Sequence, residues 1–120
     1  MNWSFQTDRP IYLQLKEQIT LLIISGQYPA GSRLPPVRDM AADAAVNPNT
    51  LQKALQELER EGLVYAQRTS GRFVTEDEKM IEQAKNQLAA EQIDRFIEKM
   101  AGIGFTVEET LALISKRVKE

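Results

Sequence analysis

Residues 46–64, VNPNTLQKALQELEREGLV, gather amide and amine side chains on one side of a predicted helix over about 48–61. Apolar residues at helical spacing predict its buried side: Leu51, Ala54, Leu55 and Leu58. The opposite side holds two basic and no acidic residues: Asn49, Gln52, Lys53, Gln56 and Arg60. Asn and Gln can bind adenine through two hydrogen bonds, and Lys can reach guanine or phosphate. A helix with such a face can read DNA bases.

The start of this helix also suits DNA. Asn47 is the expected N-cap and Pro48 the first helical residue. A helix N-terminus attracts phosphate, and Asn47 and Thr50 add short polar side chains there. Ordinary capping and solvation would explain the same residues, so the helix alone leaves both interpretations open.

The chain lacks the residues that several kinds of catalytic and metal-binding site need. The 120-residue chain has no Cys and no His, which removes Ser-His-Asp and Cys-His catalysis and imidazole or thiolate metal sites. An enzyme would depend on carboxylates, Lys or Tyr, with a carboxylate-bound Mg²⁺ as its least unfavourable form. We expect no enzyme, no metal and no cofactor.

Composition predicts a folded protein of the cytoplasm. Hydrophobic residues make up 42% of the chain and charged residues 27%, which suits a soluble domain with a core. The longest apolar run, LLII at 21–24, is too short to cross a bilayer. The N-terminus lacks a basic region followed by an apolar stretch, so we expect no secretion signal and no membrane partner.

Net charge is −2, which by itself argues against nucleic acid, but its distribution is uneven. Residues 1–75 hold eight basic and seven acidic residues, a net charge of +1. Residues 76–120 hold seven and ten, a net charge of −3. The placement of charges on particular faces therefore decides the question.

The elements around the helix over 48–61 predict a winged helix-turn-helix domain over 1–75. Trp3 and Phe5 form an arm, as a strand or an extended strap. A first helix is expected after an N-cap at Thr7 or Asp8, with Pro10 in its first turn and its end at Gly26. A second runs from the last proline of LPP to just before Asn47-Pro48.

A β-hairpin is predicted after the third helix. The residues LVYAQRTSGRFV, 63–74, place two runs of strand formers around Thr-Ser-Gly, and Gly71 can adopt positive φ. Arg68 and Arg72 flank the turn. A basic hairpin beside a polar helix start is expected of a wing, at about 64–74, that straddles a phosphate backbone.

Residues 76–120 are predicted to form a helical dimerisation tail. One long helix begins near 75–77 and is broken by Gly102 and Gly104, and Thr106 to Glu109 form a capping box before a last helix. Two isolated helices cannot bury both apolar stripes, so we expect a second subunit to cover one. The residues expected at this dimer interface are Ile81, Leu88, Ile93, Phe96, Ile97, Met100, Leu111 and Ile114. The alternative is a tail folded back on its own winged domain.

Two segments resemble a known family. LPPVRDMAADAAVNPNTLQKALQELEREGLVYAQRTSGRFV, residues 34–74, is similar to the N-terminal DNA-binding domain of the GntR family of bacterial transcription regulators, and PIYLQLKEQI, residues 10–19, to its first helix. The VNPNT start and the short two-helix tail resemble the YtrA subfamily. Larger members carry a sizeable effector or aminotransferase-like domain, for which this chain has no length.

The resemblance implies DNA contacts at particular positions. Arg38 stands where the family's second helix contacts phosphate or base, and Gly71 where the wing approaches the minor groove. The polar start of the recognition helix falls on Asn47, Asn49 and Thr50, and its next reading position on Gln52, with Lys53 beside it. The chain departs from the family at Pro36, where Ser is usual, at Ala45, where the turn has Gly, at Pro48 and Gln52, where many members have Arg, and at Arg72, where Thr is frequent.

We therefore expect a dimeric, sequence-specific DNA-binding transcription regulator, a repressor, that binds an inverted-repeat operator in double-stranded DNA. The YtrA resemblance implies control of its own operon, often one with ABC transporter genes. A small-molecule effector would have to bind between subunits or domains, and no residues identify one. The alternative is a winged-helix module that binds a protein partner through its acidic tail and does not bind DNA.

Overall fold

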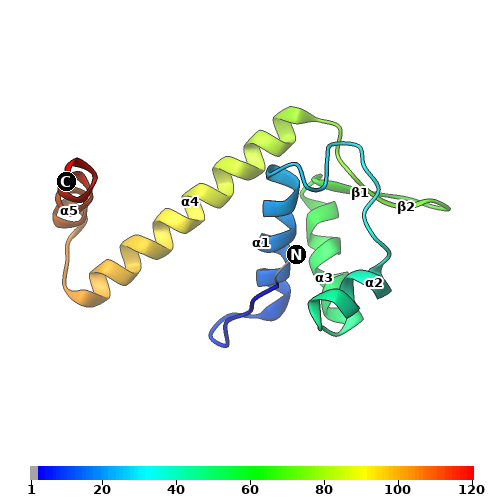
Figure 1. Ribbon diagram of the computed structural model, residues 1–120, viewed down its shortest axis with the longest axis horizontal. Helices are drawn as coiled ribbons and strands as arrows, with labels where there is room; N and C mark the ends of the chain where they lie inside the picture. The colour runs from blue at the N-terminus through cyan, green and yellow to red at the C-terminus, as the bar shows by residue number, and fades with distance from the viewer. Residues whose placement is uncertain (1–2) are drawn as a thin grey trace. The chain divides into compact units, whose positions relative to one another are not determined.

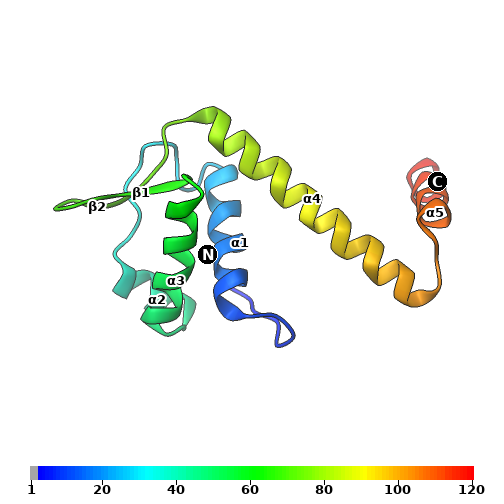
Figure 2. The ribbon, with the colours of Figure 1, turned by 180° about the vertical axis from the view of Figure 1, so that it is seen from behind.

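The computed structural model describes residues 3–120, which form two compact units, one extending through Lys85 and the other comprising Asn86–Glu120. The elements in chain order are α1 (Ile11–Ile24), α2 (Val37–Ala44), α3 (Pro48–Arg60), β1 (Val64–Gln67), β2 (Gly71–Val74), α4 (Glu78–Ile103) and α5 (Val107–Lys119). Figures 1 and 2 show these elements from opposite sides. The predicted fold class, mainly helical with a winged helix-turn-helix and two C-terminal helices, is confirmed.

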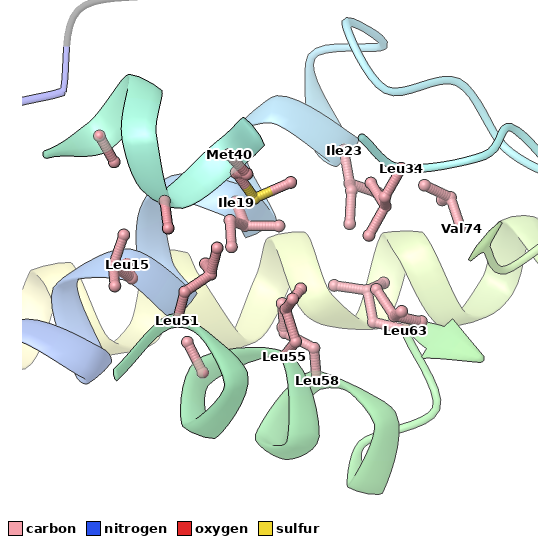
Figure 3. Close-up of a cluster of buried hydrophobic side chains, with 14 residues drawn as sticks. Leu15, Ile19, Ile23, Leu34, Met40, Leu51, Leu55, Leu58, Leu63 and Val74 are labelled. Carbon is pink, nitrogen blue, oxygen red and sulfur yellow. The ribbon is translucent and has the colours of Figure 1, made fainter. Parts of the chain in front are cut away.

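The core of the first unit lies where α3 packs against α1, α2 and β1. Leu15 and Ile19 of α1 meet the buried side of α3, and Leu34, Met40, Leu63 and Val74 close the cluster, as Figure 3 shows. The predicted inner side of α3 is confirmed, because Leu51, Ala54, Leu55 and Leu58 are all buried. Ile81 and Ala84 of α4 pack against the same core. On the opposite side of α3, Asn49, Lys53, Gln56 and Arg60 are exposed and Gln52 is half-buried.

The first helix begins later than the sequence predicts. Pro10 is the residue before α1, with φ −55° and ψ 136°, and the helix starts at Ile11. The buried side chain of Gln14 bonds the N–H and carbonyl of Gln6 and the carbonyl of Arg9, at 2.7, 2.8 and 2.8 Å. These bonds hold the preceding chain as a loop, so a helix cap at Thr7 or Asp8 is wrong.

The N-terminal arm is an extended strap and not a strand. Trp3 and Phe5 pack against the core, partly buried. The indole N–H of Trp3 donates to the Asp43 carboxylate of α2 at 2.8 Å. The arm thereby joins residues at the start of the chain to the helix-turn-helix.

The turn between α2 and α3 contains a left-handed alanine. Ala45 has φ 56° and ψ 45°, and its N–H donates to the carbonyl of Ala42 while that of Val46 donates to Ala41. This is the pattern of a Schellman motif, in which glycine is the usual residue. The left-handed conformation costs an L-residue about 1–2 kcal/mol. The turn is nevertheless held, because Val46 and Ala44 lie at the core.

The predicted hairpin is confirmed, with β1 and β2 antiparallel and Val64 opposite Val74. Gly71 has the predicted positive φ, 104°. The Tyr65 and Phe73 rings stack across the strands at 5.7 Å between centroids. In both ribbon views the hairpin projects from the helices of its unit (Figures 1 and 2). It therefore has the shape of a wing.

Both C-terminal helices have the ends that the sequence favours, with one correction. The Asp77 carboxylate accepts the N–H of Lys79 at 2.9 Å and so caps α4. The helix passes through Gly102, which does not break it, and ends at Ile103 before Gly104, whose φ is 109°. The capping box of α5 is confirmed, because Thr106 and Glu109 exchange side chain to backbone hydrogen bonds of 3.1 and 3.0 Å.

Candidate nucleic-acid interface

The polar start of α3 is built by its cap. The side-chain oxygen of Asn47 accepts the N–H of Asn49 at 2.7 Å, and Pro48 occupies the first helical position, as predicted. Asn47 and Asn49 are exposed and Thr50 is half-buried. One first-turn N–H is thus already bonded to the cap. The exposed Asn49 side chain projects from a rigid helix start.

One turn later along α3, the neighbouring residues Gln52 and Lys53 have different environments. Lys53 is exposed, and its ammonium lies 3.8 Å from the centre of the Tyr12 ring of α1. Gln52 is half-buried, and its side-chain oxygen has no hydrogen-bond partner among residues 3–120. Burying an unpaired carbonyl oxygen is unfavourable. Gln52 is therefore less available than a fully solvated side chain, although it lies on the predicted side.

Farther along α3 the charges pair. Arg60 bonds the Glu57 carboxylate at 2.6 Å, one turn earlier on the same helix. Lys16 of α1 forms an ion pair with Glu61 at the helix end. These pairs neutralise the C-terminal half of α3. The exposed Asn49 and Lys53 lie in its N-terminal half, as a helix that enters the major groove by its start requires.

The two arginines of the wing, Arg68 and Arg72, differ in exposure and in their partners. Arg68 is exposed in the turn. Arg72 is half-buried, and its Nε donates to Glu59 of α3 at 2.5 Å. This ion pair ties the wing to α3, and it was not visible in the sequence because 13 residues separate the partners. Gly71 is exposed beside Arg72.

Arg38 lies in the first turn of α2 and is exposed. Among the residues described, its side chain has no ion pair. The first unit thus brings Arg38, the start of α3 and the wing into one domain, with the buried faces of all three elements turned to the core. Tyr12, which holds Lys53, carried no signal in the sequence, because the contact joins two helices that meet only in the fold.

The predicted dimer residues have different environments. Ile81 packs against the core of the first unit, and Leu88 is buried. Ile97 and Met100 are half-buried. In the second unit Ile93, Phe96, Leu111 and Ile114 are 56, 43, 62 and 42% exposed. These four, with Ile103, Val107, Leu113 and Val118, form a large exposed apolar set that we call the tail stripe.

Residues 3–120 hold neither a metal-ligand cluster nor a membrane-spanning helix. No group of three or more His, Cys, Asp or Glu side chains in this range is placed to hold a metal ion. None of the helices described there has both the length and the apolar character needed to cross a membrane.

The helix-turn-helix, the polar start of α3 and the basic hairpin define a winged helix-turn-helix of the DNA-binding class. Residues 11–74 match the model of the gntR family of bacterial regulatory proteins. The chain belongs to this family, and it is a DNA-binding transcription regulator.

Two curated relatives from Bacillus subtilis match most of the chain. The HTH-type transcriptional regulator YhcF is 38% identical over 111 residues, covering 92% of this chain and 92% of YhcF. The HTH-type transcriptional repressor YtrA is 36% identical over 93 residues, covering 77% of this chain and 72% of YtrA. The predicted resemblance to GntR regulators of the YtrA kind is confirmed.

Two solved structures of transcription regulators are also similar to this chain. A GntR family transcriptional regulator from Listeria monocytogenes has a TM-score of 0.79 and 38% identity, covering 93% of this chain and 98% of that one. The DNA-binding domain of AraR in complex with operator ORX1 has a TM-score of 0.58 and 28% identity, covering 62% of this chain and 96% of that domain. The first likeness spans both units and the second about the length of the winged one.

Proposed function

We propose that this protein is a repressor that binds an inverted-repeat operator as a homodimer, with the start of α3 in the major groove and the wing along the backbone. The observation that carries the proposal is the exposed Asn49 at the capped start of α3, in the same winged unit as the exposed Arg38 and Arg68. The relative YtrA is named a transcriptional repressor, and the similar DNA-binding domain of AraR is seen in complex with operator DNA. The similarity of this chain to these two proteins supports the proposal.

In this proposal the side chains divide into two roles. Asn49 and Gln52 read base edges, where one paired contact gives about 1–3 kcal/mol of discrimination. Gln52 must turn outward to do so, which would release its buried oxygen. The other proposed contacts position the domain on phosphate or in the minor groove: Arg38, Asn47, Thr50, Lys53, Arg68, Gly71 and Arg72.

The tail stripe supports the homodimer. Eight large apolar side chains of one short unit are exposed, and contiguous exposed apolar surface marks an interaction site. A two-fold pairing of tails would set two recognition helices about 34 Å apart, or a multiple of it, to match the two halves of an inverted repeat. The predicted domains, 1–75 for DNA binding and 76–120 for dimerisation, stay part of the proposal, while the first compact unit of the structure extends through Lys85.

The proposal gives the protein no catalytic role and no cofactor, and it places it in the cytoplasm with the chromosome. Its partners are operator DNA and a second copy of the chain.

DNA binding is tested by fluorescence anisotropy on a duplex from the region upstream of the protein's own gene and on a scrambled duplex. The affinity of the wild type should fall with salt, log K decreasing by about 0.9 per neutralised phosphate for each unit of log salt. Asn49→Ala should lose about 1–3 kcal/mol on the operator and little on the scrambled duplex. Asn86→Ala, an exposed Asn of the second unit, is the matched control. A wild type without salt-dependent binding would favour the protein-binding alternative.

Dimerisation is tested by sedimentation. The wild type should sediment as a dimer at micromolar concentration. Leu111→Glu in the tail stripe should give monomers, because a carboxylate cannot be buried in an apolar interface without a partner. Leu21→Glu is the matched control, since Leu21 is an exposed leucine of the first unit. Equal dissociation by both variants, or a monomeric wild type, would contradict the proposed interface.

A further inference from the structure

Arg33 lies beside the wing, although it precedes α2 in the chain. A β-bridge joins Arg33 to Phe73 of β2. On either side of it, the N–H of Leu34 donates to the carbonyl of Arg72 at 2.8 Å, and the N–H of Val74 donates to the carbonyl of Ser32 at 2.9 Å. The segment thus pairs with β2 like a short third strand. The backbone of Arg33 is fixed to the base of the wing.

The pairing determines where the Arg33 side chain points. Successive side chains of an extended segment lie on opposite sides. Leu34, the next residue, is in the core and almost wholly buried. Arg33 therefore faces away from the core, and its side chain is exposed.

The guanidinium of Arg33 lies against Gly71. A methyl group at Gly71 would stand 3.2 Å from Nε and 3.5 Å from Nη2 of Arg33. Such a contact is tighter than most, so even an alanine would press on this side chain. Gly71 therefore has a second role besides its φ of 104°, because it leaves room for Arg33 at the start of β2.

Arg33 is also unneutralised. Within the described part of the chain, its side chain has no ion pair or hydrogen bond, whereas neighbouring Arg72 is bonded to Glu59. A hollow of about 100 Å³ opens next to it, between the wing and the start of α2; its lining includes Arg33, Pro36, Val37, Leu55, Gly71 and Arg72. An arginine with free donors suits a phosphate, which accepts two parallel N–H bonds from a guanidinium.

We propose that Arg33 binds a backbone phosphate of the DNA at the base of the wing. The inference rests on the proposed function, since the phosphate is that of the operator duplex. Arg33 positions the domain and does not read sequence, so its contribution should be the same on any duplex.

The test compares Arg33→Ala, Arg33→Lys and the wild type on operator and scrambled duplexes across roughly 50–200 mM salt. Arg33→Ala should weaken binding to both duplexes by the same factor. Its plot of log K against log salt should be shallower by about 0.9, so the advantage of the wild type should shrink about threefold over that range. Arg33→Lys should keep the wild-type slope. Lys85→Ala, an exposed residue outside the wing, controls for loss of one positive charge.

An Arg33→Ala slope equal to those of the wild type and Lys85→Ala would overturn the inference, as would a loss confined to the operator. The thermal midpoint of Arg33→Ala should match that of the wild type, because the backbone makes the hydrogen bonds that hold this segment and the Arg33 side chain is exposed. A wild type with no salt-dependent binding would instead refute the proposed function, and the inference with it. The two failures are therefore distinguishable.

Discussion

The ammonium of Lys53 lies 3.8 Å from the centre of the Tyr12 ring, so that a proposed DNA-binding residue of α3 rests on an aromatic side chain of α1. The contact is a cation–π interaction, worth about 0.5–1 kcal/mol at an exposed site. It holds the amine near the helix surface in the free protein. Lys53 is therefore partly preorganised, and its position depends on the packing of α1.

Replacing Lys53 should separate its two roles. Lys53→Ala should weaken binding to operator and scrambled duplexes alike, with a salt slope shallower by about 0.9, because a phosphate contact is lost. Its free energy of unfolding should fall by no more than about 1 kcal/mol. Urea titration and anisotropy measure the two effects. Tyr12→Phe, which keeps the ring, should retain both properties; a large loss of DNA binding in that variant would show that the Tyr12 hydroxyl matters more than the ring.

The Glu59–Arg72 pair should restrain the wing's affinity for DNA. Glu59→Gln removes the carboxylate that neutralises Arg72, so we expect tighter binding to every duplex and a salt slope steeper by as much as about 0.9. The stability cost should be below about 1 kcal/mol, since both side chains are partly exposed. Anisotropy over a salt series measures the change.

The gain from Glu59→Gln must depend on Arg72. In an Arg72→Ala background it should vanish, whereas Glu82→Gln, a charge loss on an exposed residue of α4, should leave binding at the wild-type level. A gain that persists without Arg72 would mean that Glu59 acts through general repulsion of DNA.

Ala45→Gly should stabilise the winged unit. Ala45 has φ 56°, where an L-residue pays about 1–2 kcal/mol and glycine does not. Glycine adds chain entropy to the unfolded state, which offsets about 0.5–1 kcal/mol. The net gain should be about 0.5–1 kcal/mol, seen as a higher midpoint in urea or heat.

Ala42→Gly is the matched control for that change. Ala42 is an exposed residue inside α2, so the same substitution there should destabilise by about 1 kcal/mol. If both variants shift the midpoint in the same direction, backbone strain at Ala45 does not limit the stability of the winged unit.

Tyr28 should give the stability an alkaline limit. Burial, and then the nearby negative charge of Asp43, raise the pKa of the Tyr28 hydroxyl above its ordinary value of 10.0. The unfolded chain thus loses this proton at lower pH than the folded one, so stability should fall as pH rises through about 10 towards the folded-state value. Tyr28→Phe should flatten that decline in urea titrations from neutral to alkaline pH.

Some elements could be predicted because their causes are local. The cap at Asn47, the proline at position 48 and the capping box from Thr106 to Glu109 each satisfy backbone groups within a few residues. The start of α1 could not be predicted, because Gln14 bonds the backbone of Gln6 and Arg9 and so competes with the helix. A long-range side-chain bond of this kind leaves no periodic signal.

The sequence by itself determined the order of helices and hairpin, the buried side of α3 and the kinship with GntR regulators, because helical periodicity, turn residues and capping are written in neighbouring positions. Only the tertiary structure decided which polar residues are free to bind. Arg72 is held by Glu59, Lys53 rests on Tyr12, and Arg33 lies against Gly71 with no ion pair to any of residues 3–120. Each of these contacts joins elements that pack together through the shared core, and the electrostatic state of a side chain depends on its neighbours in space.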